Sequence, residues 1–99
     1  MAIAYSDYEG LVGDEFQLIR DGASSLRLVL QELTRHDTQQ TETESFSIVF
    51  LGPKEPHLQQ QIQTLQHPDL GPLTVFLVPI NASSSGVEYQ AVYNVSINV

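Results

Sequence analysis

The chain of 99 residues contains no cysteine, which excludes disulfide bonds, thiolate metal sites and a cysteine nucleophile. Basic residues are also scarce, because four Lys and Arg stand against twelve Asp and Glu and give a net charge of −8. The four bases are scattered singly, whereas nucleic-acid binding needs clusters of them, and an anionic membrane surface would repel the chain. We therefore expect neither nucleic acid nor membrane as a partner. The acidic balance favours solubility, with a basic partner protein as the alternative.

Long apolar runs are absent as well. No stretch approaches the roughly 18–20 apolar residues that cross a bilayer. Residues 1–7 have neither the basic start nor the apolar segment of a secretory signal. The sequence therefore predicts a cytoplasmic protein, and its length predicts one domain over residues 1–99 with a modest core.

The most apolar segment is residues 67–80 (HPDLGPLTVFLVPI). Its first five residues form a predicted turn with His67, Pro68 and Gly71 in structural roles, where a His67 ring nitrogen could hydrogen-bond the turn backbone. Residues 75–78 have no polar side chain on either parity, so we expect a central strand covered by protein on both faces. The segment predicts a hairpin that leads into the middle of a β structure.

Other strands are predicted from alternation of apolar and polar residues. Residues 15–20 and 25–34 predict a hairpin around Asp21-Gly22, a dipeptide that suits tight turns. Leu33 changes parity, which indicates a bulge. A helix over residues 25–34 is the alternative, because Leu26 and Leu30 also fit a helical spacing behind Ser24.

The second half contains the clearest alternation. Residues 45–51 predict a core strand with Phe46, Ile48 and Phe50 on one face, ended by Gly52. Residues 87–99 alternate to the last residue and predict a long strand. We expect residues 81–86 (NASSSG) to form a flexible connector between this strand and the preceding one.

Three regions have weaker patterns. Residues 1–13 predict a single helical turn packed on the end of the fold. Residues 35–44 contain no apolar residue and predict an exposed, mobile loop. Residues 54–66 fit either a helix that begins near Pro56 or a strand over residues 62–66, and the turn that follows favours the strand. The sum predicts an all-β fold: a small antiparallel barrel or sandwich of about six strands with one or two short helical turns at most.

Four segments in this order resemble a family of small bacterial proteins classified as a domain of unknown function. They are residues 44–53 (ESFSIVFLGP), 65–71 (LQHPDLG), 75–80 (VFLVPI) and 89–94 (YQAVYN). The resemblance covers residues 8–94 and implies strands over residues 25–34 and 62–66. Members of the family often look like neighbours of phage-tail or tail-collar-like genes, which implies a role beside a tail-like or surface assembly. The family has no known catalytic residues to transfer.

Catalytic and metal-binding patterns are weak. His36, His57 and His67 form no H-x3-H or H-E-x-x-H pair, so the sequence predicts no metal site. Ser45 and Ser47 belong to the outward parity of a strand, and no Gly-x-Ser-x-Gly elbow is present.

The paired acids Glu42 and Glu44, or Asp14 and Glu15, could in principle act as glycosidase carboxylates. Both pairs lie in a turn or a loop that holds geometry poorly. We therefore expect no catalytic residue and no cofactor.

The terminal strand carries the main functional expectation. A long alternating strand that ends without charge makes a poor free edge, because its unpaired backbone invites another chain. We expect homo-oligomerisation through Val92, Val95, Ile97 and Val99.

The sequence thus predicts a non-enzymatic interaction or assembly domain. One alternative is a barrel that binds a small ligand in a cavity lined by Phe46, Phe50, Phe76 and Tyr93. A less favoured alternative is an enzyme that uses His67 with a nearby acid.

Overall fold

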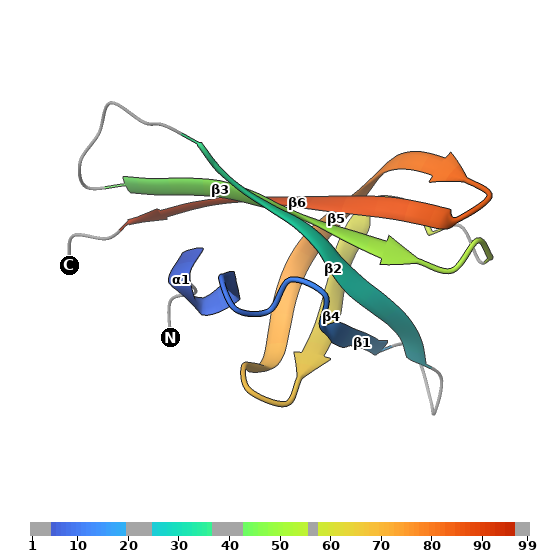
Figure 1. Ribbon diagram of the computed structural model, residues 1–99, viewed down its shortest axis with the longest axis horizontal. Helices are drawn as coiled ribbons and strands as arrows, with labels where there is room; N and C mark the ends of the chain where they lie inside the picture. Colours follow the sequence, from blue (N-terminus) through green and yellow to red (C-terminus); the bar gives the residue numbers. More distant parts are fainter. Residues whose placement is uncertain (1–4, 20–24, 37–42, 56–57, 97–99) are drawn as a thin grey trace.

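Antiparallel strands close into a barrel in the order β1-β2-β3-β6-β5-β4 (Figure 1). The computed structural model describes residues 5–19, 25–36, 43–55 and 58–96, with the backbone alone at residues 43–44 and 94–96. The elements are α1 (Tyr5–Tyr8), β1 (Glu15–Ile19), β2 (Ser25–His36), β3 (Thr43–Gly52), β4 (Gln61–His67), β5 (Gly71–Ser83) and β6 (Gly86–Ser96). The predicted all-β class is confirmed, and of its two forms the barrel is the observed one.

The hairpin predicted in the first third of the chain is present. β1 pairs with β2 so that Phe16 lies opposite Leu28, and the helical alternative for residues 25–34 is wrong. The pairing of β2 with β3 shifts between Leu30 and Glu32, which confirms the bulge expected from the parity of Leu33. The predicted turn at Asp21-Gly22 lies outside the described residues.

β3 runs through the middle of the sheet, between β2 and β6. The three bulky side chains expected in the core, Phe46, Ile48 and Phe50, are fully buried. The exposed loop predicted for residues 35–44 is wrong at both ends, because β2 continues to His36, which pairs with Ser45, and β3 begins at Thr43. Polar and β-branched residues extend a strand where its outer face meets solvent. Residues 37–42 lie outside the described part of the chain.

The hairpin of β4 and β5 confirms the strand predicted for residues 62–66. β4 ends at His67, which lies opposite Gly71, and Gly71 adopts a φ of 74°. However, the predicted burial of both faces of β5 is wrong. Val75 and Leu77 point into the core, whereas Phe76 is 50% exposed on the outside. A barrel wall is a single layer, so only one parity of each strand is covered by the core.

β5 changes neighbours along its length (Figure 1). Its residues 71–77 pair with β4, and its residues 78–83 pair with β6. The register shifts between Pro79 and Asn81, and a bulge is where a strand tolerates a proline that lacks an N–H group. The flexible connector predicted for residues 81–86 is wrong, because both strands extend into it and leave a turn of two serines. Strand pairing overrides the local turn composition here.

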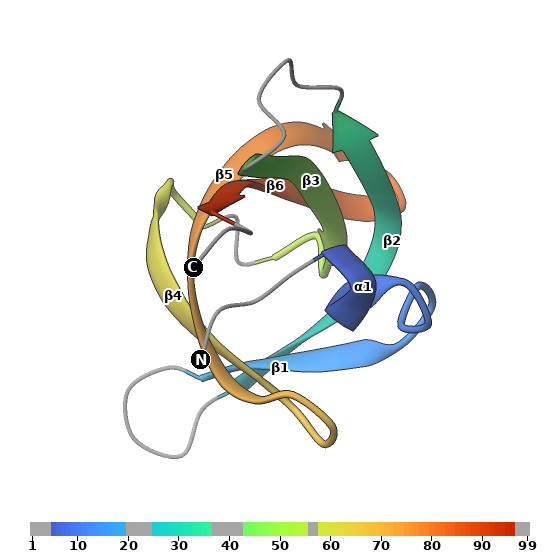
Figure 2. The same ribbon diagram turned by 90° about the vertical axis from the view of Figure 1, so that its left-hand side faces the viewer.

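α1 and the residues that follow it lie over one end of the barrel (Figure 2). The predicted helical turn is present as α1, and Tyr8 from α1 is fully buried against Phe16 and Phe46. The residues between α1 and β1 are joined to β2 by two backbone hydrogen bonds. The N–H of Gly13 donates to the carbonyl of Leu30 (2.7 Å), and the N–H of Leu30 donates to the carbonyl of Asp14 (3.0 Å).

Gly86 is a position where the fold requires glycine. Its φ is 137°, and a Cβ there would overlap the carbonyl oxygen of Gly52. We expect Gly86→Ala to lower the free energy of unfolding by at least about 2 kcal/mol, because of left-handed strain plus a backbone clash. Gly10→Ala is the matched control, since a Cβ at Gly10 has no neighbour within 4 Å. Urea unfolding that gives both variants the same stability would contradict this account.

Candidate functional site

His67 ends β4 and uses both of its ring nitrogens within the protein. Its Nδ1 accepts a hydrogen bond from the backbone N–H of Asp69 (3.0 Å), which is the turn contact that the sequence predicts. Its Nε2 lies 3.0 Å from Oδ2 of Asp14. Because Nδ1 acts as an acceptor, the ring proton is on Nε2, and this N–H donates a hydrogen bond to the carboxylate of Asp14. The ring is 4% exposed and packs at 4.7 Å against Phe16.

This arrangement ties two distant segments together. Asp14 precedes β1, and Asp69 lies in the turn between β4 and β5, so the ring joins the N-terminal segment to the β4–β5 hairpin. The acid that an enzyme using His67 would need is present as Asp14. However, neither ring nitrogen is open to a substrate while both bonds are made. The geometry therefore favours a structural role for His67, as for Gly71 in the same turn.

The other candidate groups do not converge. His36 bonds through Nε2 to Oγ of Ser47 (3.1 Å), and Ser47 is buried even though it belongs to the outward parity. The predicted exposure of Ser47 is therefore wrong, because the end of β2 covers it. His57 lies outside the described residues, as does Glu42. Among the described residues, no group of three His, Asp or Glu could hold a metal ion.

Asp14 and Glu15, the acid pair at the start of β1, also bind different partners. Asp14 binds His67, whereas Glu15 forms an ion pair with Arg27 at 3.1 Å. The two carboxylates thus have different partners and do not form the facing pair that glycoside hydrolysis needs.

The barrel interior is filled by side chains. Phe46 and Phe50 are fully buried in a core cluster, and Tyr93 packs against it. Phe76 is on the outside, so the predicted cavity lining of four aromatic residues is wrong at that position. The parity of β5 explains the error, because Leu73, Val75 and Leu77 occupy its inner face.

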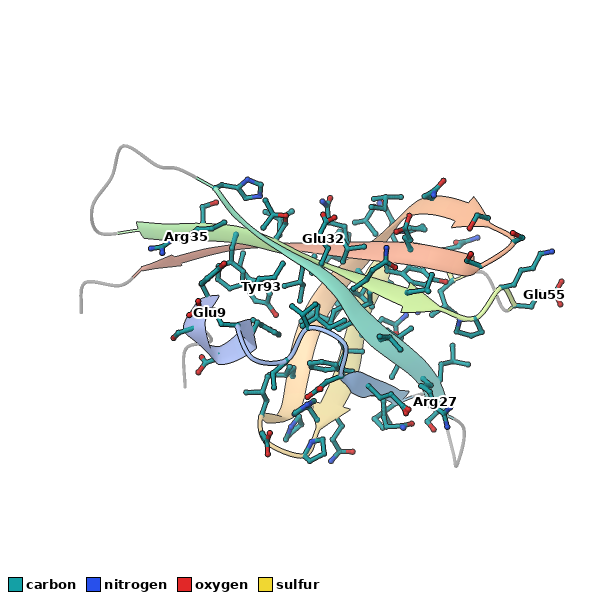
Figure 3. All side chains as sticks on the ribbon, in the orientation of Figure 1. Glu9, Arg27, Glu32, Arg35, Glu55 and Tyr93 are labelled. Carbon is teal, nitrogen blue, oxygen red and sulfur yellow. The ribbon has the colours of Figure 1, made fainter. Side chains whose placement is uncertain are left out.

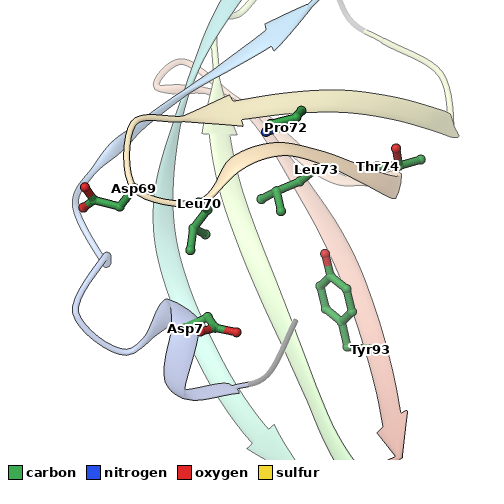
Figure 4. A pocket seen from close by; sticks show the side chains of 7 residues that line it. All are labelled: Asp7, Asp69, Leu70, Pro72, Leu73, Thr74 and Tyr93. Carbon is green, nitrogen blue, oxygen red and sulfur yellow. The ribbon is translucent and has the colours of Figure 1, made fainter. Parts of the chain in front are cut away.

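A pocket of about 520 Å³ lies beside the closed end of the barrel (Figure 4). Its lining includes Asp7 from α1, Asp69 and Leu70 from the β4–β5 turn, Leu73 and Thr74 from β5, and Tyr93 from β6. No pattern in the sequence indicates this site. Its residues come from four elements, and they meet only because β5 leaves β6 near Val78.

Tyr93, which lines this pocket, is paired with Tyr8. The hydroxyl groups of Tyr8 and Tyr93 are 3.0 Å apart, and the Tyr93 ring stacks on Phe46 at 4.9 Å. Burial raises the pKa of both phenols above the ordinary value of 10.0. The pair therefore stays neutral and fixes the orientation of Tyr93.

Among the described residues, no second strand pairs with one edge of the end of β6, which we call the open edge. Along residues 91–96, β6 pairs with β3, whereas its pairing with β5 ends where Gln90 lies opposite Val78. Of the four residues expected to mediate association, Val92 is 59% exposed and Val95 pairs through its backbone with Glu44. Ile97 and Val99 lie outside the described residues.

The comparisons with known proteins identify a family but no function. A family model described as a domain of unknown function (DUF6916) matches residues 3–93. No curated protein and no solved structure matches the chain. Within the residues that the structure describes, no helix is long and apolar enough to cross a membrane.

The role assigned to His67 predicts a large effect on stability. We expect His67→Ala to lower the free energy of unfolding by about 2–4 kcal/mol, since it removes two hydrogen bonds and the contact with Phe16. His36→Ala removes an exposed ring with one bond and should cost about 1 kcal/mol. Urea unfolding of both variants measures the difference. Equal losses would show that His67 does not tie the two segments together.

The tyrosine pair predicts a loss of stability at alkaline pH. Both phenols are neutral in the fold with a raised pKa, whereas the unfolded chain ionises near pH 10. The stabilising contribution of each phenol is thus fully present below about pH 10 and falls above it by at most about 1.4 kcal/mol per pH unit. Urea unfolding of the natural chain and of Tyr8→Phe between about pH 8 and about pH 11 measures this loss. We expect a shallower fall for Tyr8→Phe, and equal slopes would contradict the assignment.

Proposed function

We propose a role from the fold itself, because the chain belongs to a family, DUF6916, that is described only as a domain of unknown function. The proposed role is that of a non-enzymatic interaction or assembly domain that pairs with a second copy through β6. The open edge along residues 91–96 carries this proposal.

An open strand edge presents a row of backbone donors and acceptors. Such a row pairs readily with a strand of another chain, and natural proteins usually block it with charge, proline or a covering segment. Residues 91–96 (AVYNVS) contain no charged residue and no proline. This edge therefore has none of the side chains that usually prevent strand pairing.

The local absence of charge also favours a second copy of the chain. Two β6 edges could pair antiparallel about a twofold axis, in which each strand contacts its own symmetry mate. The net charge of −8 opposes association in general, but no charged side chain of residues 91–96 would face its mate. The edge is thus suited to self-association in spite of the acidic chain.

The alternatives have less support. A ligand inside the barrel would have to displace the buried side chains of the core cluster. An enzyme that uses His67 would have to break a hydrogen bond of that ring before it could accept a proton.

We extend the proposal to the setting of the protein: a cytoplasmic bacterial chain, accessory to a phage-tail-like or surface assembly. The resemblance of residues 44–53, 65–71, 75–80 and 89–94 to small bacterial proteins supports this setting. A subunit of such an assembly needs edges that contact copies or neighbours, which agrees with the open edge of β6.

Light scattering over a range of concentrations tests the edge. We expect the natural chain to form a defined oligomer, and Val92→Lys to weaken the association at least about tenfold, because a lysine blocks strand pairing. Ile62→Lys is the control, since Ile62 is 67% exposed on β4 and does not belong to the β6 edge. A monomer at every concentration would overturn the proposal. So would a loss of association in Ile62→Lys alone, or an unchanged oligomer after deletion of residues 96–99.

A further inference from the structure

The pocket of about 520 Å³ borders the open edge of β6. β5 leaves β6 at Val78, so residues 71–77 of β5 and residues 91–96 of β6 are not paired with each other in the described structure. Tyr93 extends from β6 to the side on which α1 lies, and it lines the pocket (Figure 3). The same residue therefore belongs both to the edge proposed for association and to the pocket.

Apolar side chains face the space in front of Tyr93. Leu70 from the β4–β5 turn and Leu73 from β5 lie across this space from the Tyr93 ring, whereas Asp69 is directed away from it (Figure 4). Leu73 is buried, and Leu70 packs against the core. The hydroxyl of Tyr8 contacts that of Tyr93 and fixes its ring. On these sides the space is thus lined by apolar groups whose positions are already set.

Strand pairing determines which side chains of a second copy reach this space. Side chains directly opposite each other in an antiparallel pair lie on the same face, with Cβ atoms about 4.5–5.5 Å apart. A twofold axis perpendicular to the sheet keeps the faces, so the inner parity of one β6 meets the inner parity of the other. Tyr93 has the inner parity, because its ring stacks on Phe46 in the barrel.

The inner parity of the strand contains no charge. Residues 91, 93 and 95 are Ala, Tyr and Val. Any register that pairs Tyr93 within residues 91–96 of the second copy therefore places one of these uncharged side chains beside the Tyr93 ring. A pocket of this volume has room for it.

We propose that the pocket binds an apolar or aromatic side chain of the second copy's β6, so that the β4–β5 turn belongs to the interface together with the strand edge. Such a contact rests on the proposed association through β6 and adds a side-chain site to it. The contact removes apolar surface of Leu70 and Leu73 from water, which backbone pairing alone does not. A charged side chain would lose its hydration against these leucines, so the pocket favours a second copy over a strand with charged inner positions.

Isotope-filtered nuclear magnetic resonance of a mixed sample of full chains tests the contact. Half of the chains carry carbon-13 in the leucine methyl groups and nitrogen-15 in the backbone, and the others are unlabelled. We expect nuclear Overhauser effects from the methyl groups of Leu70 and Leu73 to residues 91–95 of the unlabelled copy. Contacts along the β6 backbone without these methyl contacts would overturn the pocket contact and leave the proposed association intact. A sample without any contact between copies would overturn both.

Two leucine substitutions separate the pocket from the edge. Leu70→Ala removes a half-buried side chain from the pocket and should weaken association about three- to tenfold, because apolar contact between the copies is lost. Leu58→Ala is the matched control, since Leu58 is also half-buried against the core but precedes β4, at the end of that strand opposite the turn. Sedimentation gives both dissociation constants, and equal values would overturn the proposal. The labelled mixture uses the natural chain and does not depend on the folding of either variant.

Discussion

The fold depends on β5, which pairs with a different strand along each half of its length. β5 pairs first with β4 and then, past Val78, with β6, and this change of partner closes the ring of strands. The bulge between Pro79 and Asn81 allows it, because a bulge bends a strand and increases its twist. The same bend separates the first half of β5 from the second half of β6. The pairing of β5 with β6 that closes the ring of strands therefore leaves the two strands apart at the end where α1 lies.

Where β5 and β6 are no longer paired, side-chain hydrogen bonds connect the N-terminal segment to the barrel. The hydroxyl groups of Tyr8 and Tyr93 meet there, and the His67 ring joins Asp14 to the backbone of Asp69. The described residues contain no buried side-chain nitrogen or oxygen without a hydrogen-bond partner. Each polar group that the N-terminal segment brings inside is thus compensated, which is the condition for burying it without loss of stability.

Much of this fold follows from alternation in the sequence, and the errors have physical causes. Period two identified the inner faces of β1, β3 and β6 and the bulge near Leu33, because burial imposes that period on each strand. The prediction from alternation was wrong at Phe76, which is exposed. A run of apolar residues does not show whether protein covers one face of a strand or both. The prediction was also wrong at residues 81–86, where long-range pairing outweighs turn composition. The pocket could not be predicted, because its residues lie between positions 7 and 93 and meet only after β5 bends.

The proposed association depends on the same bend in β5. Backbone pairing along residues 91–96 would give affinity for almost any strand, so preference for a second copy has to come from the side chains along the edge. Residues 91–96 carry no charge, and two copies could therefore bring these edges together without the repulsion that the net charge of −8 produces in general. The separation of β5 from β6 past Val78 thus leaves unpaired the edge through which we propose that the chain associates.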